Sequence, residues 1–367
     1  MRILVTGHQG YIGSVLTPIL IENGHFVVGL DSGLFEGARL EPASNAVPGV
    51  RKDIRDVTPD DLEGFDAIIH LAGLPGSLID AVGWRAAHAI NYVAAVRLAS
   101  IARFAGVRRY VFPSTGAVYG QTGKQPVSER CTPQPNGTHS TLKHLVEQDV
   151  MRLADGDFSP TFLRLGSVSG WSPAMRFDLL LNDMVAQAFT RGFVQLGPYA
   201  AAQYTPIHVQ DVAHAFAAVV EAPPEMVRGK VFNVAQTAEP YSAAELAVVA
   251  AAAIPGCSMR LESDVCTDAN SLALDGSRIT WALPSFKPRW SVHETVAQLH
   301  QIYHTLGLTA AQLASAPLER RAHLRHLAQQ GLLDRDLRLN TGADRTYSSG
   351  GDMWRSCDAG LRINPAD

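Results

Sequence analysis

The feature that most constrains the fold is a strand that runs directly into a glycine-rich turn at the start of the chain. Residues 1–7 read Met-Arg-Ile-Leu-Val-Thr-Gly, and glycine returns at Gly10 and Gly13. We predict a strand over Ile3–Thr6 and a helix over Tyr11–Glu22, with glycine where the backbone turns tightly. The first turn of such a helix offers unpaired N–H groups and a partial positive charge to an anion.

Strand-like and helix-like segments then alternate as far as about residue 165. Apolar runs predict further strands over residues 25–30, 66–71, 109–112 and 161–165. Helices are expected between them, over residues 84–105 and 139–154. Because these strands show no alternation of polar and apolar residues, helices should cover both faces of their sheet. The sequence therefore predicts an α/β fold with a doubly wound parallel sheet.

Proline frequency, element length and charge pattern divide the chain into three parts. Residues 1–170 are expected to form the parallel-sheet domain, to which later segments return. Residues 171–306, with frequent prolines and shorter elements, are expected to form a smaller lobe for the substrate. Residues 307–367 are expected to form an extension that is helical with paired charges from Glu319 to Arg338 and ends in a polar tail.

Charge and cysteine content narrow the classes of partner. The chain has 31 Lys and Arg against 35 Asp and Glu, a net charge of −4, which lacks the basic surface that a phosphate backbone requires. The four cysteines are far apart, and no apolar run reaches the roughly 18 residues of a membrane span. We expect no nucleic-acid partner, no membrane insertion and no metal, and a reducing cytoplasm.

An acidic residue stands at the end of the second predicted strand. Asp31 follows Gly13 by 18 residues, where a carboxylate can accept hydrogen bonds from both adenosine ribose hydroxyls of a dinucleotide. Its charge repels a 2′-phosphate, so NAD is favoured over NADP. Helix capping is the alternative role for Asp31. Asp53 and Ile54 follow the third strand and are candidates for the adenine edge.

Further motifs follow in order along the chain, at Thr6–Gly13, Asp31, His70–Gly73, Asn91, Ser114–Gly120, Lys143, Arg164–Gly166 and Ile207–Val212. Over about residues 1–305 they resemble the extended short-chain dehydrogenase/reductases, in the branch of NAD-dependent epimerases and dehydratases that act on nucleotide sugars. This resemblance implies a Rossmann-type sheet with a smaller C-terminal substrate lobe, and a homodimer built on the two longest helices of the first domain. The residues that it implies for NAD are Gly7, Gln9, Gly10, Tyr11, Ile12, Gly13, Asp31, Asp53, Ile54, Leu71, Ala72, Gly73, Ser114, Lys143, Gly166, Ser167 and Val168.

The catalytic residues that the resemblance implies are present except for one. Thr115 has the position of the Ser or Thr that orients the substrate hydroxyl, and Lys143 that of the Lys beside the catalytic Tyr. Where the family has this Tyr, four residues before Lys143, the chain has His139.

Histidine can act as the base on physical grounds. Residues four apart share one helix face, so His139 and Lys143 should point into one site. Imidazole has a reference pKa of about 6.5, and a neighbouring ammonium lowers it, which keeps the ring neutral and able to accept a proton. The alternatives are that His139 is an inert replacement, or that Tyr119 takes the role of the acid.

The expected substrate contacts depart from the family in one place. Besides Thr115 and Ala117, the resemblance implies Arg176 and Asn182 for the sugar or its phosphate. Many members also bind the diphosphate with an Arg, and here that position is Tyr204, which cannot form the charge-assisted contact.

The sequence favours one reaction among several. The 4,6-dehydratases of the family carry Asp-Glu after the catalytic Thr, where this chain has Gly116-Ala117. We therefore predict an oxidoreductase acting on a sugar hydroxyl, with C4 epimerisation of a nucleotide sugar through a transient ketone and His139 as the base. A net dehydrogenase, reductase or dehydratase on a sugar or nucleoside-like metabolite is the alternative enzyme. A catalytically silent NAD-binding sensor or scaffold is the alternative of another class.

Overall fold

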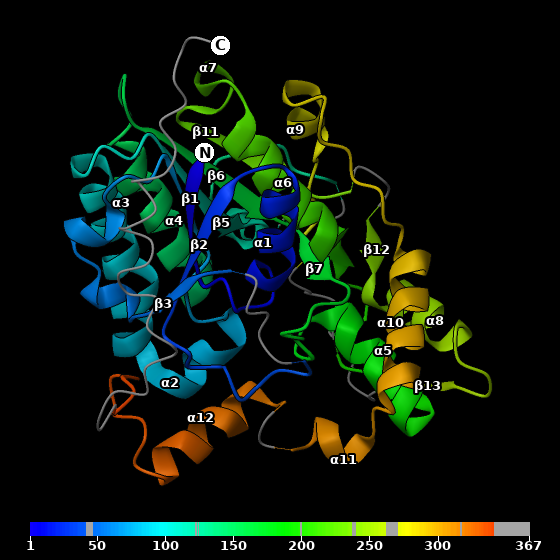
Figure 1. The fold of residues 1–367 in the computed structure, drawn as a ribbon. Coiled ribbons are helices and arrows are strands. Elements are labelled where there is room, and N and C mark those ends of the chain that lie inside the picture. Colours follow the sequence, from blue (N-terminus) through cyan, green and yellow to red (C-terminus); the bar gives the residue numbers. More distant parts are fainter. Residues whose placement is uncertain are drawn as a thin grey trace, which may run out of the picture.

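A seven-stranded parallel sheet forms the centre of the molecule, in the order β11-β6-β5-β4-β1-β2-β3 (Figure 1). The computed structural model describes residues 1–340 apart from 42–46, 122, 124, 199, 237–239, 262–270 and 316–317. The doubly wound α/β fold predicted from the sequence is confirmed. The strands are β1 (Arg2–Thr6), β2 (Phe26–Asp31), β3 (Gly49–Arg51), β4 (Ala67–His70), β5 (Arg109–Thr115), β6 (Ser159–Leu165) and β11 (Lys230–Val234).

Helices cover both faces of this sheet because its strands bury apolar side chains on both sides. In β1, Ile3 and Val5 pack into the core under one helical layer, while Leu4 between them packs under the other. The first layer comprises α1 (Gly13–Glu22), α6 (Val209–Glu221), α7 (Pro224–Val227) and α9 (Ser277–Ala282). The second comprises α2 (Gly76–His88), the π-helical turn η3 (Ala89–Val93), α3 (Ala94–Phe104) and α4 (Thr138–Met151). Single 3-10 turns lie at η1 (Ile54–Asp56), η2 (Pro59–Leu62) and η4 (Gly116–Tyr119).

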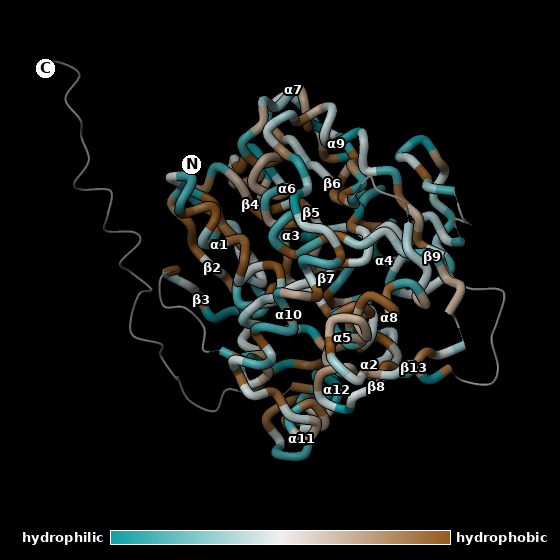
Figure 2. Tube along the Cα trace, turned by 90° about the vertical axis from the view of Figure 1, so that its right-hand side faces the viewer, coloured by the Kyte–Doolittle hydropathy of each residue, from teal (hydrophilic) through white to brown (hydrophobic). Residues whose placement is uncertain are grey.

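A second group of elements packs around its own apolar core beside the sheet. Its centre is α5 (Leu180–Arg191), α8 (Ala243–Ala252) and α10 (Val292–Leu306), whose apolar faces meet. Figure 2 shows hydrophobic stretches along the tube at α8 and β2. Short strands pair as β7 (Ser167–Ser169) with β10 (Pro206–His208), β8 (Phe193–Leu196) with β13 (Ser258–Leu261), and β9 (Gln203–Tyr204) with β12 (Tyr241–Ser242).

The extension after α10 folds back under the sheet. Its helices are α11 (Ala310–Leu313), which packs on α5, and α12 (Arg320–Gln329), which packs on α2 (Figure 1). The prediction of a helical stretch through Arg338 is wrong, because Gly331 at φ 69° ends the helix and the chain turns. We call residues 318–340 the C-terminal segment. The polar tail predicted from Asn340 lies, after Asn340 itself, outside the described residues.

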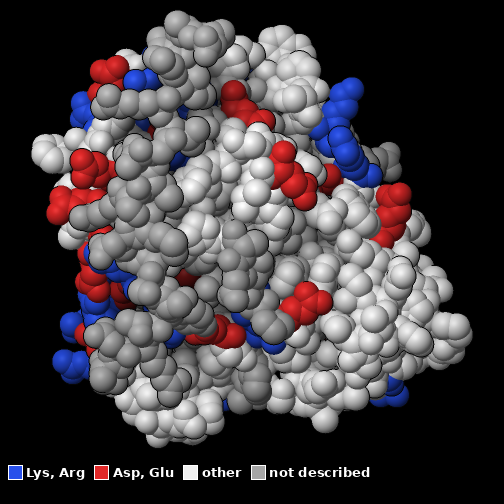
Figure 3. All heavy atoms as spheres, viewed as in Figure 1, with Lys and Arg blue, Asp and Glu red and all other residues white. Residues whose placement is uncertain are grey.

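Charged side chains are mixed on the face of the molecule seen in Figure 3. Acidic and basic groups alternate along its left edge, and much of the right-hand side carries neither. None of the described helices is both long and apolar enough to cross a membrane. Among the same residues, no group of three or more His, Cys, Asp or Glu side chains is placed to hold a metal ion.

Candidate active site

A cavity of about 380 Å³ opens where the sheet strands end, at the carboxyl edge of β1, β2, β4, β5 and β6. Most of the residues predicted for the site meet there. Those lining the cavity are Gly7, Gly10, Tyr11, Ile12, Gly13, Asp31, Asp53, Ile54, Leu71, Ala72, Gly73, Ser114, Thr115, His139, Lys143, Gly166, Ser167, Val168 and Arg176. Gln9, Ala117, Asn182 and Tyr204 are not among the lining residues.

The glycine turn is as tight as the sequence predicts. Gly7 has φ +70°, and a Cβ there would lie 2.7 Å from the backbone nitrogen of Ala72. A Cβ on Gly13 would lie 2.3 Å from the carbonyl oxygen of Gly7. No side chain among the described residues caps the first turn of α1. The N–H groups of Ser14 and Val15 already donate to the carbonyl oxygens of Gly10 and Ile12, so the N–H groups of residues 11–13, which line the cavity, are the ones left for a ligand. A diphosphate fits this turn, because it satisfies those N–H groups and the helix dipole together.

Asp31 is held at the cavity by the loops on either side of it. Its Oδ2 accepts a hydrogen bond from the backbone N–H of Gln9 at 3.2 Å, and its Oδ1 accepts one from Gly33 at 2.9 Å. Gln9 therefore acts through its backbone, which positions the carboxylate. Arg39 donates to the carbonyl oxygen of Gln9 and, at 3.2 Å, to the hydroxyl of Ser14, which fixes the same loop from outside.

Asp53, which follows β3, also lines the cavity. Arg55 binds both of its oxygens, with Nε 2.9 Å from Oδ1 and Nη2 2.5 Å from Oδ2. Burial would raise the pKa of the Asp53 carboxyl, but the hydrogen bonds and charge of Arg55 outweigh it and hold the pKa below its usual value. The carboxylate beside Ile54 is therefore ionised and already paired.

Helix α4 brings His139 and Lys143 to the cavity one turn apart. Lys143 Nζ donates to the carbonyl oxygen of Pro113 at 2.8 Å and lies 4.4 Å from the centre of the Phe112 ring. The His139 ring packs against Gly76, where a Cβ would come within 3.2 Å of Cγ. Its Nδ1 is shielded from solvent and has no hydrogen-bond partner among the described residues. Thr115 ends β5 and accepts a hydrogen bond from the Ala117 N–H at 3.2 Å.

Burial dominates the protonation of both α4 side chains. It lowers the pKa of His139 to about 3, with further lowering by the charges of Lys143 and Arg176. It lowers the pKa of Lys143 to about 8, although the Glu147 carboxylate acts in the opposite direction. At neutral pH the imidazole is therefore neutral and the amine is protonated.

The buried residues behind the site are already paired. Glu147 accepts two hydrogen bonds from Arg164, at 3.0 Å from Nε and 2.6 Å from Nη2. Tyr119, the alternative acid, donates its hydroxyl to Asn233 Oδ1 at 2.9 Å and does not line the cavity. Its hydroxyl is thus committed elsewhere.

The predicted substrate residues outside the cavity lining have other contacts. Asn182 is fully buried, accepts from the Gly170 N–H at 2.9 Å and donates to the Tyr11 hydroxyl at 3.2 Å. It also donates to the carbonyl oxygen of Arg176 at 3.0 Å, so it positions a residue that does line the cavity. Tyr204 lies in the small β9–β12 ribbon, opposite Tyr241.

Many lining residues were not predicted from the sequence, among them Phe35, Arg55, Arg320 and Leu337. Phe35 and Arg55 follow β2 and β3 in stretches without a motif. Arg320 and Leu337 belong to the C-terminal segment, whose charged pattern predicts an exposed helix and gives no sign of contact with the cavity.

The comparisons with known proteins identify the family of the chain. The chain matches the sequence model described as "NAD dependent epimerase/dehydratase family" over residues 3–235. A UDP-glucose 4-epimerase of Corynebacterium glutamicum is 30% identical over 177 residues, which are 46% of this chain and 52% of that protein. One of Mycolicibacterium smegmatis is 38% identical over 155 residues, 39% and 48% of the two chains. The chain thus spans about half the length of these curated relatives.

Two solved structures extend the comparison over more of the chain. MoeE5 in complex with UDP-glucuronic acid and NAD superposes with a TM-score of 0.71 at 26% identity, covering 83% of this chain and 100% of that chain. A UDP-glucuronic acid 4-epimerase from Bacillus cereus, in complex with UDP-glucuronic acid and NAD, gives a TM-score of 0.70 at 21% identity with the same coverage. The second likeness concerns the fold alone.

Proposed function

Because this chain belongs to the NAD-dependent epimerase/dehydratase family, we propose that it inverts C4 of a nucleotide sugar through a transient ketone, with His139 as the base. One observation carries this proposal: Thr115, His139 and Lys143 line the same cavity as the glycine turn. The curated relatives are named UDP-glucose 4-epimerases, which favours C4 chemistry and a uridine nucleotide.

NAD is the cofactor of the family, and each part of the cavity suits one part of it. When bound, NAD supplies the hydride acceptor and donor at the substrate carbon. The glycine turn would hold the diphosphate, and Asp31 the hydroxyls of the adenosine ribose. Lys143 uses one N–H for the Pro113 carbonyl oxygen, which leaves two donors for the second ribose.

The catalytic residues divide the work of moving one proton. Thr115 orients the C4 hydroxyl, and the neutral His139 accepts its proton and holds it while C4 is a ketone. His139 returns the proton when the alcohol forms again with the opposite configuration. The protonated ring is costly in this pocket, because it is shielded from water and faces Lys143 and Arg176. The negative charge of a bound nucleotide diphosphate offsets that cost.

The residues after Thr115 disfavour dehydration. A Cβ on Gly116 would lie 2.6 Å from a methyl group of Leu274, so this position is closed by apolar side chains. Neither Gly116 nor Ala117 provides the carboxylate that elimination of water requires. Net oxidation or reduction of the sugar, and silent binding of NAD, are the outcomes against which epimerisation is tested.

A homodimer in the cytoplasm stays part of this proposal. The second helical layer carries large apolar side chains that are exposed in the single chain, with Trp84 at 53%, Val93 at 47% and Phe104 at 83%. Such side chains on neighbouring helices support association through this face. Light scattering of the purified protein, with Phe104→Glu as the disrupting variant, checks the oligomeric state.

The test of the reaction is a direct assay of C4 inversion. The purified protein is incubated with NAD and UDP-galactose or UDP-glucose, and both sugars are followed by NMR. Interconversion without net formation of NADH supports epimerisation. Stoichiometric NADH would identify a dehydrogenase instead, and NAD binding without any turnover would identify a silent binder.

A further inference from the structure

Part of the cavity wall comes from a region of the chain that the family model does not cover. Arg320 and Leu337 line the same cavity as Gly10 and Asp31. Both belong to the C-terminal segment, whereas the family model matches residues 3–235. The cofactor cavity of this protein is therefore bounded by a piece of chain that follows the sheet by many residues.

Helix α12 is docked on the sheet domain by buried contacts. Leu324 and Leu333 are each only 6% exposed and pack into the apolar core beneath α2 and α3. His323 is 7% exposed, and its Nε2 donates to the carbonyl oxygen of Leu34 at 2.9 Å. Arg321 donates to the carbonyl oxygen of Ser77 at 2.8 Å. The position of α12 relative to the cavity is thus fixed by the same residues that shape the sheet domain.

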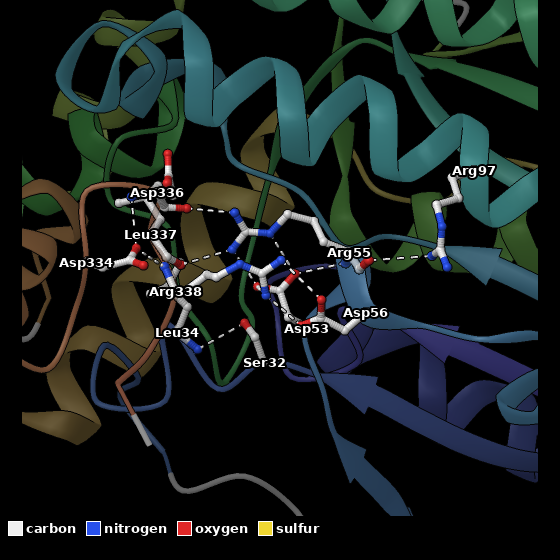
Figure 4. A network of polar contacts seen from close by, with 10 residues as sticks. All are labelled: Ser32, Leu34, Asp53, Arg55, Asp56, Arg97, Asp334, Asp336, Leu337 and Arg338. Atoms are coloured by element: carbon white, nitrogen blue, oxygen red, sulfur yellow. Dashed lines mark hydrogen bonds and ion pairs between the residues drawn. The ribbon is translucent and has the colours of Figure 1, made fainter. Parts of the chain in front are cut away.

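A polar network fixes the end of the segment at the Asp53 side of the cavity (Figure 4). Arg55, which grips Asp53, also donates to the carbonyl oxygens of Asp336 at 2.7 Å and Leu337 at 3.4 Å. Arg338 binds both oxygens of Asp56, at 2.6 and 3.1 Å. One arginine therefore joins the predicted adenine edge to the C-terminal segment.

Arg320 forms no ion pair with a carboxylate in the part of the chain that the structure describes. Its guanidinium lies 4.8 Å from the centre of the Phe35 ring, and its buried Nε has no hydrogen-bond partner among the described residues. The nearby Asp178 is already bound by Arg176, at 2.9 and 2.5 Å. Burial, and after it the charge of Arg176, lowers the pKa of Arg320. The carboxylates of Asp178 and Asp31 also act on Arg320, and the charge of Arg39 acts against them. Three arginines therefore face two carboxylates here, and an anionic ligand would neutralise the excess positive charge.

Leu337 is held in a strained conformation that faces the cavity. It is the one non-glycine residue with positive φ in the described part of the chain, at 58°. Such a conformation costs of order 1–3 kcal/mol and persists only where its surroundings impose it. Asp334 imposes it here, because its Oδ1 accepts hydrogen bonds from the N–H groups of Asp336 and Arg338, both at 2.8 Å.

We propose that the C-terminal segment is part of the NAD site, with Arg320 binding the diphosphate of the dinucleotide and Leu337 covering its adenosine end. The proposal rests on NAD binding by this cavity and does not depend on the reaction at C4. It gives the strained Leu337 and the unpaired Nε of Arg320 one common function. It also implies that bound NAD leaves only when the segment moves, so its dissociation is slow.

The test compares two arginines of α12. Arg320→Gln removes the cation that lines the cavity, and Arg325→Gln is the matched control, because Arg325 is exposed on the same helix and does not line the cavity. Affinity is measured by calorimetry for NAD, ADP-ribose, adenosine and UDP-glucose, and NAD dissociation by stopped flow. We expect Arg320→Gln to weaken NAD and ADP-ribose about 10- to 100-fold, as for a lost charge-assisted hydrogen bond, and to leave adenosine unchanged.

A second variant tests the adenosine end without removing a charge. Leu337→Gly relieves the backbone strain while deleting the side chain, so the melting temperature should not fall, whereas NAD, ADP-ribose and adenosine should all dissociate faster. Equal NAD affinity of Arg320→Gln and Arg325→Gln would overturn the proposal. Loss of UDP-glucose binding alone would assign Arg320 to the substrate diphosphate and overturn it as well. NAD binding that depends on Arg320, in a protein without C4 turnover, would support this inference and refute the proposed reaction.

Discussion

The carboxyl edge of the sheet and the C-terminal segment face one cavity but are held in place by different forces. At the sheet edge, strand hydrogen bonds and close backbone contacts fix the residues, and Gly7 and Gly13 leave no room for a side chain. The C-terminal segment is held by a few buried side chains and by ion pairs. One of these, Arg338 with Asp56, joins side chains that are 42% and 49% exposed.

The difference indicates which part can move. An exposed ion pair contributes about 0–1 kcal/mol, whereas disturbing the glycine turn would disturb the sheet itself. Regions with few buried contacts open locally at a small fraction of the global free energy of unfolding. We therefore expect the sheet edge to determine chemistry and cofactor identity, and the segment to determine how long the cofactor stays.

The largest effect should be the loss of turnover when His139, on the sheet-edge side of the cavity, is replaced. His139→Ala should lower turnover about 10²–10⁴-fold, the usual contribution of a positioned base, while NAD affinity stays within a factor of a few. Steady-state assays and NAD titration measure the two separately. His293→Ala is the control, because His293 is exposed on α10 and does not line the cavity. Retained activity in His139→Tyr would place the site in the family's geometry, and unchanged turnover in His139→Ala would remove His139 from the mechanism.

Asp31 tests cofactor choice at the same edge. Asp31→Ala should weaken NAD about 10- to 100-fold, since one or two hydrogen bonds to a charged acceptor are lost, and should narrow the preference over NADP. Calorimetric titration with NAD and with NADP gives the ratio of the two dissociation constants. Asp60→Ala removes an exposed carboxylate outside the cavity and should change neither value. Equal affinities for NAD and NADP in the unmutated protein would contradict the assignment.

The dependence of turnover on pH tests the sheet-edge side of the cavity without a mutation. The pKa of Lys143 is lowered to about 8, so its ammonium is present below that pH and is lost as pH rises through it. Turnover should fall about tenfold per unit above pH 8. Because the pKa of His139 is lowered to about 3, no acidic limb should appear near 6.5. A clear acidic limb near 6.5 would mean that the imidazole titrates as an exposed group.

The smallest effect should come from loosening the C-terminal segment at its ion pairs. Arg55→Ala removes bonds to Asp53, Asp336 and Leu337 together and should cost about 1–3 kcal/mol of docking free energy. Arg338→Ala removes an exposed pair and should cost at most about 1 kcal/mol. Hydrogen exchange over residues 318–340 measures the loss of docking free energy in each variant. Faster exchange in Arg338→Ala than in Arg55→Ala would reverse the order of the two anchors.

The sequence predicts the sheet-edge side of the cavity well because its residues obey local rules. A strand followed by Gly7, Gly10 and Gly13 has few possible geometries, and residues four apart on one helix must share a face. The strand–turn rule places Asp31 at the cavity, and the helix rule predicts that His139 and Lys143 point into one site. The family resemblance predicts that this site is the catalytic one.

The other side could not be predicted from local rules. Arg320 reaches the cavity because Leu324 and Leu333 dock on a surface formed by distant residues, and its charged neighbours are typical of any exposed helix. The family position of Asn182 likewise does not reveal that its amide bonds to Tyr11, Gly170 and Arg176. Long-range packing decided both cases.

The position of the C-terminal segment in the chain also means that the two sides of the cavity are synthesised at different times. The sheet is complete in sequence at Val234, and Arg320 follows about 85 residues later. At roughly 5–20 residues per second, the ribosome needs several seconds to cover that distance. During this interval the glycine turn and the strand ends have been synthesised, but the C-terminal segment that covers them has not. A dinucleotide can therefore enter from the open side during translation and be enclosed when α12 docks.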